Sequence, residues 1–134
     1  MVMQVHGRYS DMTSYGFMGN MGIWFENFAL PVVINECMMQ SYTGTINLFP
    51  NWPMENDAEF QNLRAAGAFL VSAVLRDGKT RKIQIMSEAG GLLKIILPWT
   101  DGGIVTSGNA KKVLSSPIVE IQMEKGENIC FQPK

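Results

Sequence analysis

The chain has few of the residues that build metal centres and nucleophilic active sites. Its 134 residues include two cysteines and a single histidine, His6. No cysteine or carboxylate stands at a ligand-like spacing from His6, so we expect neither a metal site nor another cofactor. A Ser-His-Asp arrangement would have to recruit His6 from close to the N-terminus. Cys37 and Cys130 lie far apart in the sequence and are interpreted as buried free thiols, with a disulfide as the alternative.

Charge and long hydrophobic runs are also scarce. Charged residues make up 17% of the chain and the net charge is −1, without the basic stripe that nucleic-acid binding requires. No apolar run reaches the roughly 18 residues of a membrane-spanning helix. The start, MVMQVHGRYSDM, lacks the charged and apolar regions of a signal peptide. The targeting signal of a secreted or periplasmic parent protein would therefore lie outside this chain.

The strongest hydrophobic pattern is an apolar helix expected near residues 28–41. Asn27 is a suitable N-cap, and Pro31 falls in the first turn, where its missing N–H costs little. The helix is expected to end near Ser41 or Tyr42. Glu36 would need a partner if it were buried. Candidate partners are Arg64 and Lys94. Apolar residues cover almost every side of this helix, namely Leu30, Val32, Val33, Ile34, Cys37, Met38 and Met39.

A helix that is apolar all round belongs inside a larger protein or assembly. Only about two dozen residues precede this one, too few to wrap it. The chain therefore reads as the tail of something larger, or as a homo-oligomer that associates through the helix at residues 28–41.

From Thr45 onward the hydrophobic period changes to two, which is typical of strands. We expect a polar connection at residues 54–64, with a helical turn near 58–63, and a hairpin at Asp77-Gly78. A final hairpin should pair the last two strands across Lys125-Gly126. The expected strands are residues 45–48, 68–75, 81–87, 92–97, 104–106, 118–123 and 128–131. Short strands between glycine-centred turns predict a mainly β fold, an antiparallel β-sandwich with one α-helix on its N-terminal side. Residues 1–41 would be an irregular lead plus the helix, and residues 42–134 the sandwich.

Three stretches resemble the C-terminal end of glycoside hydrolase family 95, the α-L-fucosidase and α-L-galactosidase family. They are FENFALPVVINECMMQSYTGTINLFPNWP, FQNLRAAGAFLVSAVLRDGK and IQIMSEAGGLLKIILPW. Family members typically show the motif Asp-(Gly/Ala)-Asn-Phe-Gly-Gly, a helix ending near Gln-Ser, an acidic-Gly-hydrophobic turn, a Leu-Leu-Pro-Ala-Leu-Pro-like strand and Leu-Arg-Ala-Arg-Gly-Gly-Phe. Their counterparts follow here in the same order, as Glu26-Asn27-Phe28, Gln40-Ser41, Thr43-Gly44-Thr45-Ile46, Leu48-Phe49-Pro50-Asn51-Trp52-Pro53 and Leu63-Arg64-Ala65-Ala66-Gly67-Ala68-Phe69. The similarity runs from about residue 20 to residue 100.

The resemblance implies an inverting glycoside hydrolase with an N-terminal β-domain, a catalytic (α/α) toroid and a C-terminal β-domain. This chain would carry only a remnant of the toroid in residues 1–41 and the C-terminal β-domain in residues 42–134. An inverting pair holds its carboxyl groups roughly 6.5–9.5 Å apart, and the general acid would lie upstream of Met1. Without it, the chain alone is expected to be inactive.

The second catalytic carboxylate of the family is the Asp of the first motif. An alignment without gaps places it on Phe25, next to Glu26. Glu26 and Asn27 are therefore the candidate catalytic residues, and a one-residue backbone shift would bring Glu26 into the position. As the alternative, Glu26 simply precedes the helix and favours its dipole.

Two functions remain in view. In the first, the chain is a non-catalytic β-sandwich domain that braces the absent toroid. In the second, it is a free-standing carbohydrate- or protein-binding module. Trp24, Trp52 and Trp99 are candidate carbohydrate-binding residues, since aromatic faces pack against sugar C–H surfaces. The alternative is that these rings pack inside the protein with one polar edge left wet.

Overall fold

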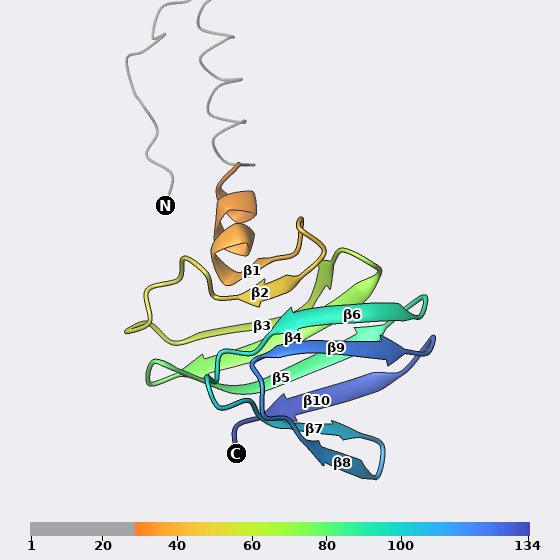
Figure 1. The fold of residues 1–134 in the computed structure, drawn as a ribbon. Coiled ribbons are helices and arrows are strands. Elements are labelled where there is room, and N and C mark those ends of the chain that lie inside the picture. The colour runs from red at the N-terminus through yellow and green to blue at the C-terminus, as the bar shows by residue number, and fades with distance from the viewer. Residues whose placement is uncertain (1–28) are drawn as a thin grey trace, which may run out of the picture. The chain divides into compact units, whose positions relative to one another are not determined.

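The computed structural model describes residues 29–134. Within this range one helix covers residues 29–38 and ten strands follow it (Figure 1). The boundary between two compact units falls between Glu36 and Cys37. Among these residues, no helix is long and apolar enough to cross a membrane.

The unit that begins at Cys37 consists of two packed β-sheets, which confirms the predicted mainly β sandwich. All neighbouring strands are antiparallel except β2 and β6, which pair in parallel. The four-stranded sheet has the order β1 (Met39–Gln40), β2 (Ile46–Leu48), β6 (Gly91–Ile96) and β9 (Ile118–Met123). The six-stranded sheet has the order β3 (Ala58–Ala65), β4 (Phe69–Arg76), β5 (Lys79–Ser87), β10 (Asn128–Gln132), β7 (Ile104–Ser107) and β8 (Ala110–Val113).

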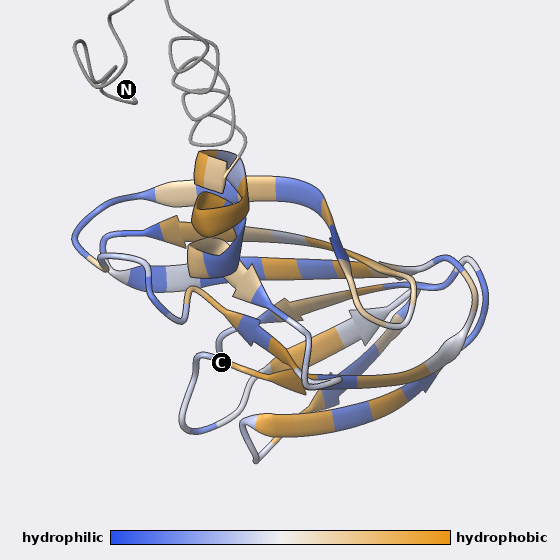
Figure 2. Cartoon of the chain, turned by 90° about the horizontal axis from the view of Figure 1, so that it is seen from above, coloured by the Kyte–Doolittle hydropathy of each residue, from blue (hydrophilic) through white to orange (hydrophobic). Residues whose placement is uncertain are grey.

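The core lies between the facing sides of the two sheets. Side chains along β4 alternate between buried and half-buried. Figure 2 shows bands of hydrophobic and hydrophilic residues along several of the strands. Such alternation is what a strand with one face on the core requires. The fully buried apolar side chains come from both sheets and include Val71, Leu75, Ile83, Ile85, Leu93, Ile95, Ile129 and Phe131.

The predicted hairpin at Asp77-Gly78 is confirmed. Both residues have positive φ, 51° for Asp77 and 69° for Gly78, as a two-residue hairpin turn of the mirror-image type requires. The turn joins β4 to β5, and Ile83 and Ile85 lie inside while Lys82 is exposed. Burial along β5 from Lys82 onward therefore follows the predicted alternation. The register shifts by one residue beside the turn, because Leu75 pairs with Thr80 and Val74 with Lys82, which leaves Arg81 without a partner on β4.

The helix ends earlier than expected. It stops at residue 38 instead of near Ser41 or Tyr42, and Met39 begins β1 with its side chain almost fully buried. The amide of Phe49 donates to the carbonyl of Met38 at 2.6 Å, and β1 pairs with β2. Pairing with the sheet and burial of Met39 replace the last helical turn.

The polar connection expected at residues 54–64, with a helical turn near 58–63, is wrong. Residues 58–65 form β3, which pairs antiparallel with β4. Ala58 and Phe60 are buried on the core side, while Glu59 and Gln61 are exposed. The segment looked polar because one face of this strand is directed away from the core.

The final hairpin is also wrong, although both of its strands exist. Strand β9 pairs with β6 in one sheet, whereas β10 pairs with β5 and β7 in the other. The Lys125-Gly126 turn therefore carries the chain from sheet to sheet. It is held against the end of β5, because the amide of Gly126 donates to the carbonyl of Ser87 and the amide of Ser87 donates to the carbonyl of Glu127.

The side chains of Glu36 and of the two cysteines were also subjects of prediction. Glu36 is exposed, so it does not need the buried partner that was considered. Arg64 pairs instead with Glu88 at 2.8 Å, and Lys94 pairs with Glu120 at 3.0 Å. Cys37 and Cys130 are free thiols, as expected, but each is half-buried.

Glu127 stabilises the Lys125-Gly126 turn between β9 and β10, and its carboxylate makes the stability of the fold depend on pH. Its carboxylate accepts hydrogen bonds from the Glu124 amide and the Ser107 hydroxyl, both at 2.9 Å. These bonds hold the pKa of Glu127 below its ordinary value of 4.5. A lowered pKa in the folded state stabilises the fold above the unfolded value and loses that effect as pH falls through the folded value.

We therefore expect the free energy of unfolding to fall more steeply between pH 6 and pH 3 in the wild type than in Glu127→Gln. Urea titrations at each pH measure the difference. Glu124→Gln is the matched control, because no hydrogen bond within residues 29–134 engages the Glu124 side chain. Equal pH slopes for the wild type and Glu127→Gln would contradict the assignment.

Candidate functional site

The candidate catalytic residues Glu26 and Asn27, and the candidate sugar-binding Trp24, lie outside the described residues. The other two tryptophans are in the sandwich. Trp52 follows β2 and Trp99 follows β6, and because these strands are parallel neighbours both connections leave the four-stranded sheet at the same end.

Both of these indole rings donate a hydrogen bond to a backbone carbonyl of the sandwich. The Trp52 Nε1–H donates to the carbonyl of Asn56, and the Trp99 Nε1–H donates to the carbonyl of Thr80, each at 3.0 Å. Both rings are half-buried and pack against the hydrophobic core. The ring of Trp99 also covers Gly103 so closely that an added Cβ there would lie 2.9 Å from it. This is the geometry of packing side chains whose polar edges are already satisfied.

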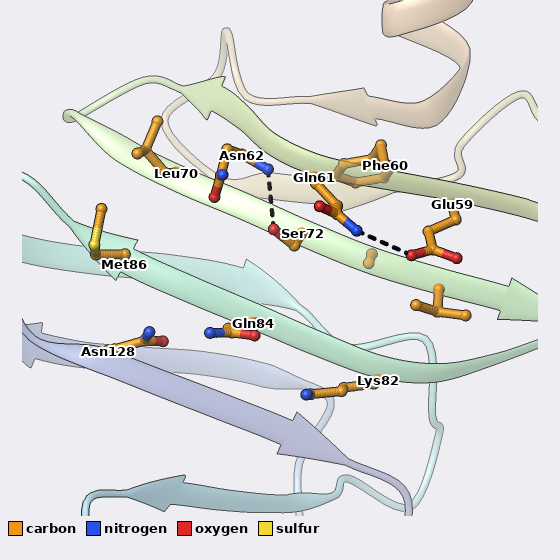
Figure 3. Close-up of a pocket in the computed structure, with 12 residues that line it drawn as sticks. Glu59, Phe60, Gln61, Asn62, Leu70, Ser72, Lys82, Gln84, Met86 and Asn128 are labelled. Carbon is orange, nitrogen blue, oxygen red and sulfur yellow. Dashed lines mark hydrogen bonds between the residues drawn. The ribbon is translucent and has the colours of Figure 1, made fainter.

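A separate site candidate is a hollow of about 330 Å³ on the six-stranded sheet. The hollow lies over β3, β4, β5 and the start of β10 (Figure 3). Its volume is at the lower end of the range for small-molecule sites, roughly 300–1,000 Å³. Its lining is mixed, with polar Glu59, Gln61, Asn62, Ser72, Lys82, Gln84 and Asn128 and apolar Phe60, Leu70, Ala73, Val74 and Met86.

Strand register explains why these residues meet. Ser72 of β4 lies opposite Gln84 of β5, and Leu70 lies opposite Met86, which in turn lies opposite Asn128 of β10. Side chains two residues apart on one strand share a face. The half-buried positions of β4 and β5 therefore form one surface, on the side of the sheet opposite the core.

A β-bulge in β3 shapes the rim of the hollow. Phe60 pairs with Ala73 and Leu63 pairs with Val71, so Gln61 and Asn62 together face the single residue between them, Ser72. Asn62 has a φ of 54°, a left-handed conformation that asparagine tolerates better than most residues. Its backbone N–H donates to the Ser72 hydroxyl at 2.9 Å, drawn as the dashed line between these two residues in Figure 3. Bulges re-aim side chains, and here two amides are brought to one edge of the hollow.

The hollow has two charged lining residues, Glu59 and Lys82. Glu59 accepts from Arg76 Nη2 at 2.8 Å and from the Gln61 side-chain amide at 3.3 Å, so its negative charge is paired. Lys82 stands across the hollow on β5 and is exposed. Within the described residues, no salt bridge engages Lys82.

Three amides at the hollow keep their hydrogen-bonding capacity. Among residues 29–134, no hydrogen bond occupies the side-chain amides of Asn62, Gln84 or Asn128. Each such amide offers one carbonyl acceptor and two N–H donors. The arrangement can therefore bind a polar ligand through paired donors and acceptors. Residues 29–134 contain no group of three or more His, Cys, Asp or Glu side chains that could hold a metal ion.

The alternation along the predicted strand 81–87 places Lys82 and Gln84 on its outer face, but it does not reveal the other residues of the hollow. Its signal was present in Ala58, Glu59, Phe60 and Gln61, which alternate between apolar and polar with a period of two. The amides of the bulge and of Asn128 come together only through strand pairing, which that short pattern does not specify.

A second surface of interest is the helix at residues 29–38. Its apolar side chains Leu30, Val32, Val33 and Ile34 are exposed, with Val32 at 59% and Val33 at 57%. An amphipathic surface helix normally turns such residues toward a core. These residues therefore mark apolar surface that is available for contact.

No known protein-family model matches this chain, and no curated protein sequence matches it either.

Proposed function

We propose that this chain is a non-catalytic C-terminal β-sandwich domain of a fucosidase-like glycoside hydrolase. Its helix would dock against an (α/α) toroid catalytic domain, and the sandwich would brace that toroid. The similarity to family 95 motifs over about residues 20–100 supports the proposal. So does the order of elements, because an apolar helix is followed directly by a two-sheet sandwich.

The exposed apolar side chains of the helix carry the docking part of this proposal. Contiguous apolar surface of this kind marks contact sites in soluble proteins. Leu30, Val33 and Ile34 recur at the three-four spacing of one helical stripe, so a partner could cover them together. In the isolated chain the same stripe should be covered by a second copy.

We expect the isolated chain to self-associate, and the double variant Val33→Ser, Ile34→Ser to be monomeric. Serine has nearly the helix propensity of valine and isoleucine, so the substitution removes apolar surface without breaking the helix. Light scattering coupled to size exclusion measures the mass, and the denaturant midpoint of the sandwich should stay unchanged.

Val113→Ser is the control, because Val113 is exposed to a similar degree, at 65%, but lies on the edge strand β8. It should leave the mass as in the wild type. A monomeric wild type at high concentration, or equal effects of both variants, would overturn docking through the helix. The DNA immediately upstream tests the parentage: toroid-coding sequence there supports it, and an unrelated gene contradicts it.

The alternative function is a free-standing carbohydrate- or protein-binding module. The sugar-binding role of Trp52 and Trp99 stays a prediction; both rings are half-buried against the core, and their N–H groups are bonded within the chain. The hollow on the six-stranded sheet gives a carbohydrate-binding function better support, and all of its lining residues belong to the sandwich.

A further inference from the structure

We propose that the hollow on the six-stranded sheet is a binding site for a neutral saccharide. The site is built by the bulge of β3 and the outer faces of β4, β5 and β10. It stands independently of the docking role of the helix, since all of its residues belong to the sandwich.

The amides select for a ligand with many hydroxyl groups. Asn62, Gln84 and Asn128 each present a donor and an acceptor side by side, and none of the three amides is occupied within residues 29–134. Two adjacent sugar hydroxyls present the complementary pair, since each hydroxyl both donates and accepts. The Ser72 hydroxyl accepts from the Asn62 backbone and still has its own proton to donate.

The charged residues of the lining do not build an anion site. The carboxylate of Glu59 is held by Arg76 and Gln61, which leaves Lys82 as the one exposed cation among the lining residues. A single flexible ammonium at the edge does not form the planar cluster of donors with which proteins hold carboxylate or phosphate groups. The ammonium group of Lys82 can instead donate a hydrogen bond to a sugar hydroxyl or ring oxygen.

Apolar side chains complete the complementarity. Leu70 and Met86 are cross-strand partners at one end of the hollow, and Val74 lies opposite Lys82 at the other end. Sugars carry C–H groups on the faces of their rings, and these groups pack on apolar side chains while the hydroxyls reach the amides. A lining of this mixed kind, with a few convergent polar groups, is what small-molecule sites show.

The frame of the site is fixed before any ligand arrives. The bulge is tied to β4 by the bond from Asn62 to Ser72, and Glu59 is tied to Arg76 on the same neighbouring strand. Gln84 lies on β5, which has β4 on one side and β10 on the other. A backbone held on paired strands in this way loses less freedom on binding than a loop would, which favours affinity.

The test is a two-dimensional ¹⁵N–¹H NMR titration of the whole chain with defined oligosaccharides. The neutral probes are cellotriose, maltotriose, mannotriose and xylotriose, and trigalacturonate is the anionic probe. We expect at least one neutral probe to bind in the millimolar range or tighter and to shift the side-chain amide signals of Asn62, Gln84 and Asn128. Gln84→Ala should weaken that binding roughly tenfold, the loss expected for two hydrogen bonds.

Gln122→Ala is the matched control, because Gln122 is an exposed glutamine on β9 of the other sheet. It should leave the affinity unchanged. Asn128→Ala provides a second variant on a different strand, and denaturant midpoints verify that each variant is folded. Three outcomes overturn the proposal: no shift with any neutral probe, shifts that Gln84→Ala and Asn128→Ala leave unaltered, or tighter binding of trigalacturonate than of every neutral probe.

Discussion

Replacing Phe69 with alanine is expected to lower the free energy of unfolding by about 3–5 kcal/mol, the usual cost of removing an enclosed aromatic ring. Phe69 is 4% exposed and begins β4, where it pairs with Ala65 on one side and Ser87 on the other. Its ring packs against Gly67, since an added Cβ at Gly67 would lie 2.8 Å from it. Collapse around the vacated space is limited, because strands hold the backbone on both sides.

Denaturant midpoints and slopes measure the effect, and Ile118→Ala is the control. Ile118 is a large apolar residue with 67% exposure on the edge strand β9, so its truncation should cost little. Small and equal losses for both variants would mean that Phe69 does not contribute to the core in solution.

The sequence predicted those parts of the fold whose signals are local. The Asp77-Gly78 turn and the alternation on either side of it predict β4, β5 and their antiparallel pairing within two dozen residues. The bulge at Arg81, which shifts their register by one residue beside the turn, was not predicted. The apolar helix was also predicted, but its end was not. Met39 suits a helix, and only the distant β2 and the hydrogen bond from Phe49 to Met38 turn the chain into sheet pairing at this point.

The errors arose where partners are distant or where the pattern is interrupted. In β3 the bulge at Gln61 and Asn62 breaks the period of two, so a paired strand resembled a polar connection. The strand β8 escaped prediction because all four of its residues are exposed and show no alternation. For β9 and β10 the short turn suggested a hairpin, but the strands have other neighbours in two different sheets.

The hollow, like these strands, could not be predicted from local sequence patterns. The pattern identifies Gln84 as facing outward, and nothing local connects it with Asn62 or Asn128. Their proximity follows from three pairings, of β3 with β4, β4 with β5 and β5 with β10. A site distributed over four strands has no linear motif, so it becomes visible only when the register of each pair is known.

Gly102 lies in the connection between β6 and β7, and its replacement by alanine is expected to cause a large loss of stability. Gly102 is buried with a φ of +79°, and its amide closes a turn onto the carbonyl of Trp99 at 3.0 Å. A Cβ at this position would lie 2.1 Å from the carbonyl oxygen of Leu114, which is backbone and cannot rotate away. Leu114 is itself fixed, because its amide donates to the carbonyl of Gly103 at 2.7 Å.

We expect Gly102→Ala to lower the free energy of unfolding by about 2–5 kcal/mol. Of this, about 1–2 kcal/mol is the cost of a left-handed conformation for a residue with a Cβ. The remainder is the cost of forcing extra atoms into a packed region, about 1–3 kcal/mol. Gly108→Ala separates the two terms, because Gly108 has a φ of +54° but nothing within 4 Å of the added Cβ. Denaturant unfolding of both variants should therefore give a small loss at Gly108 and a much larger one at Gly102. If the two losses were equal, the segment around Leu114 would not cross Gly102 this closely in solution, and the packing of β7 and β8 onto the end of the sandwich would need revision.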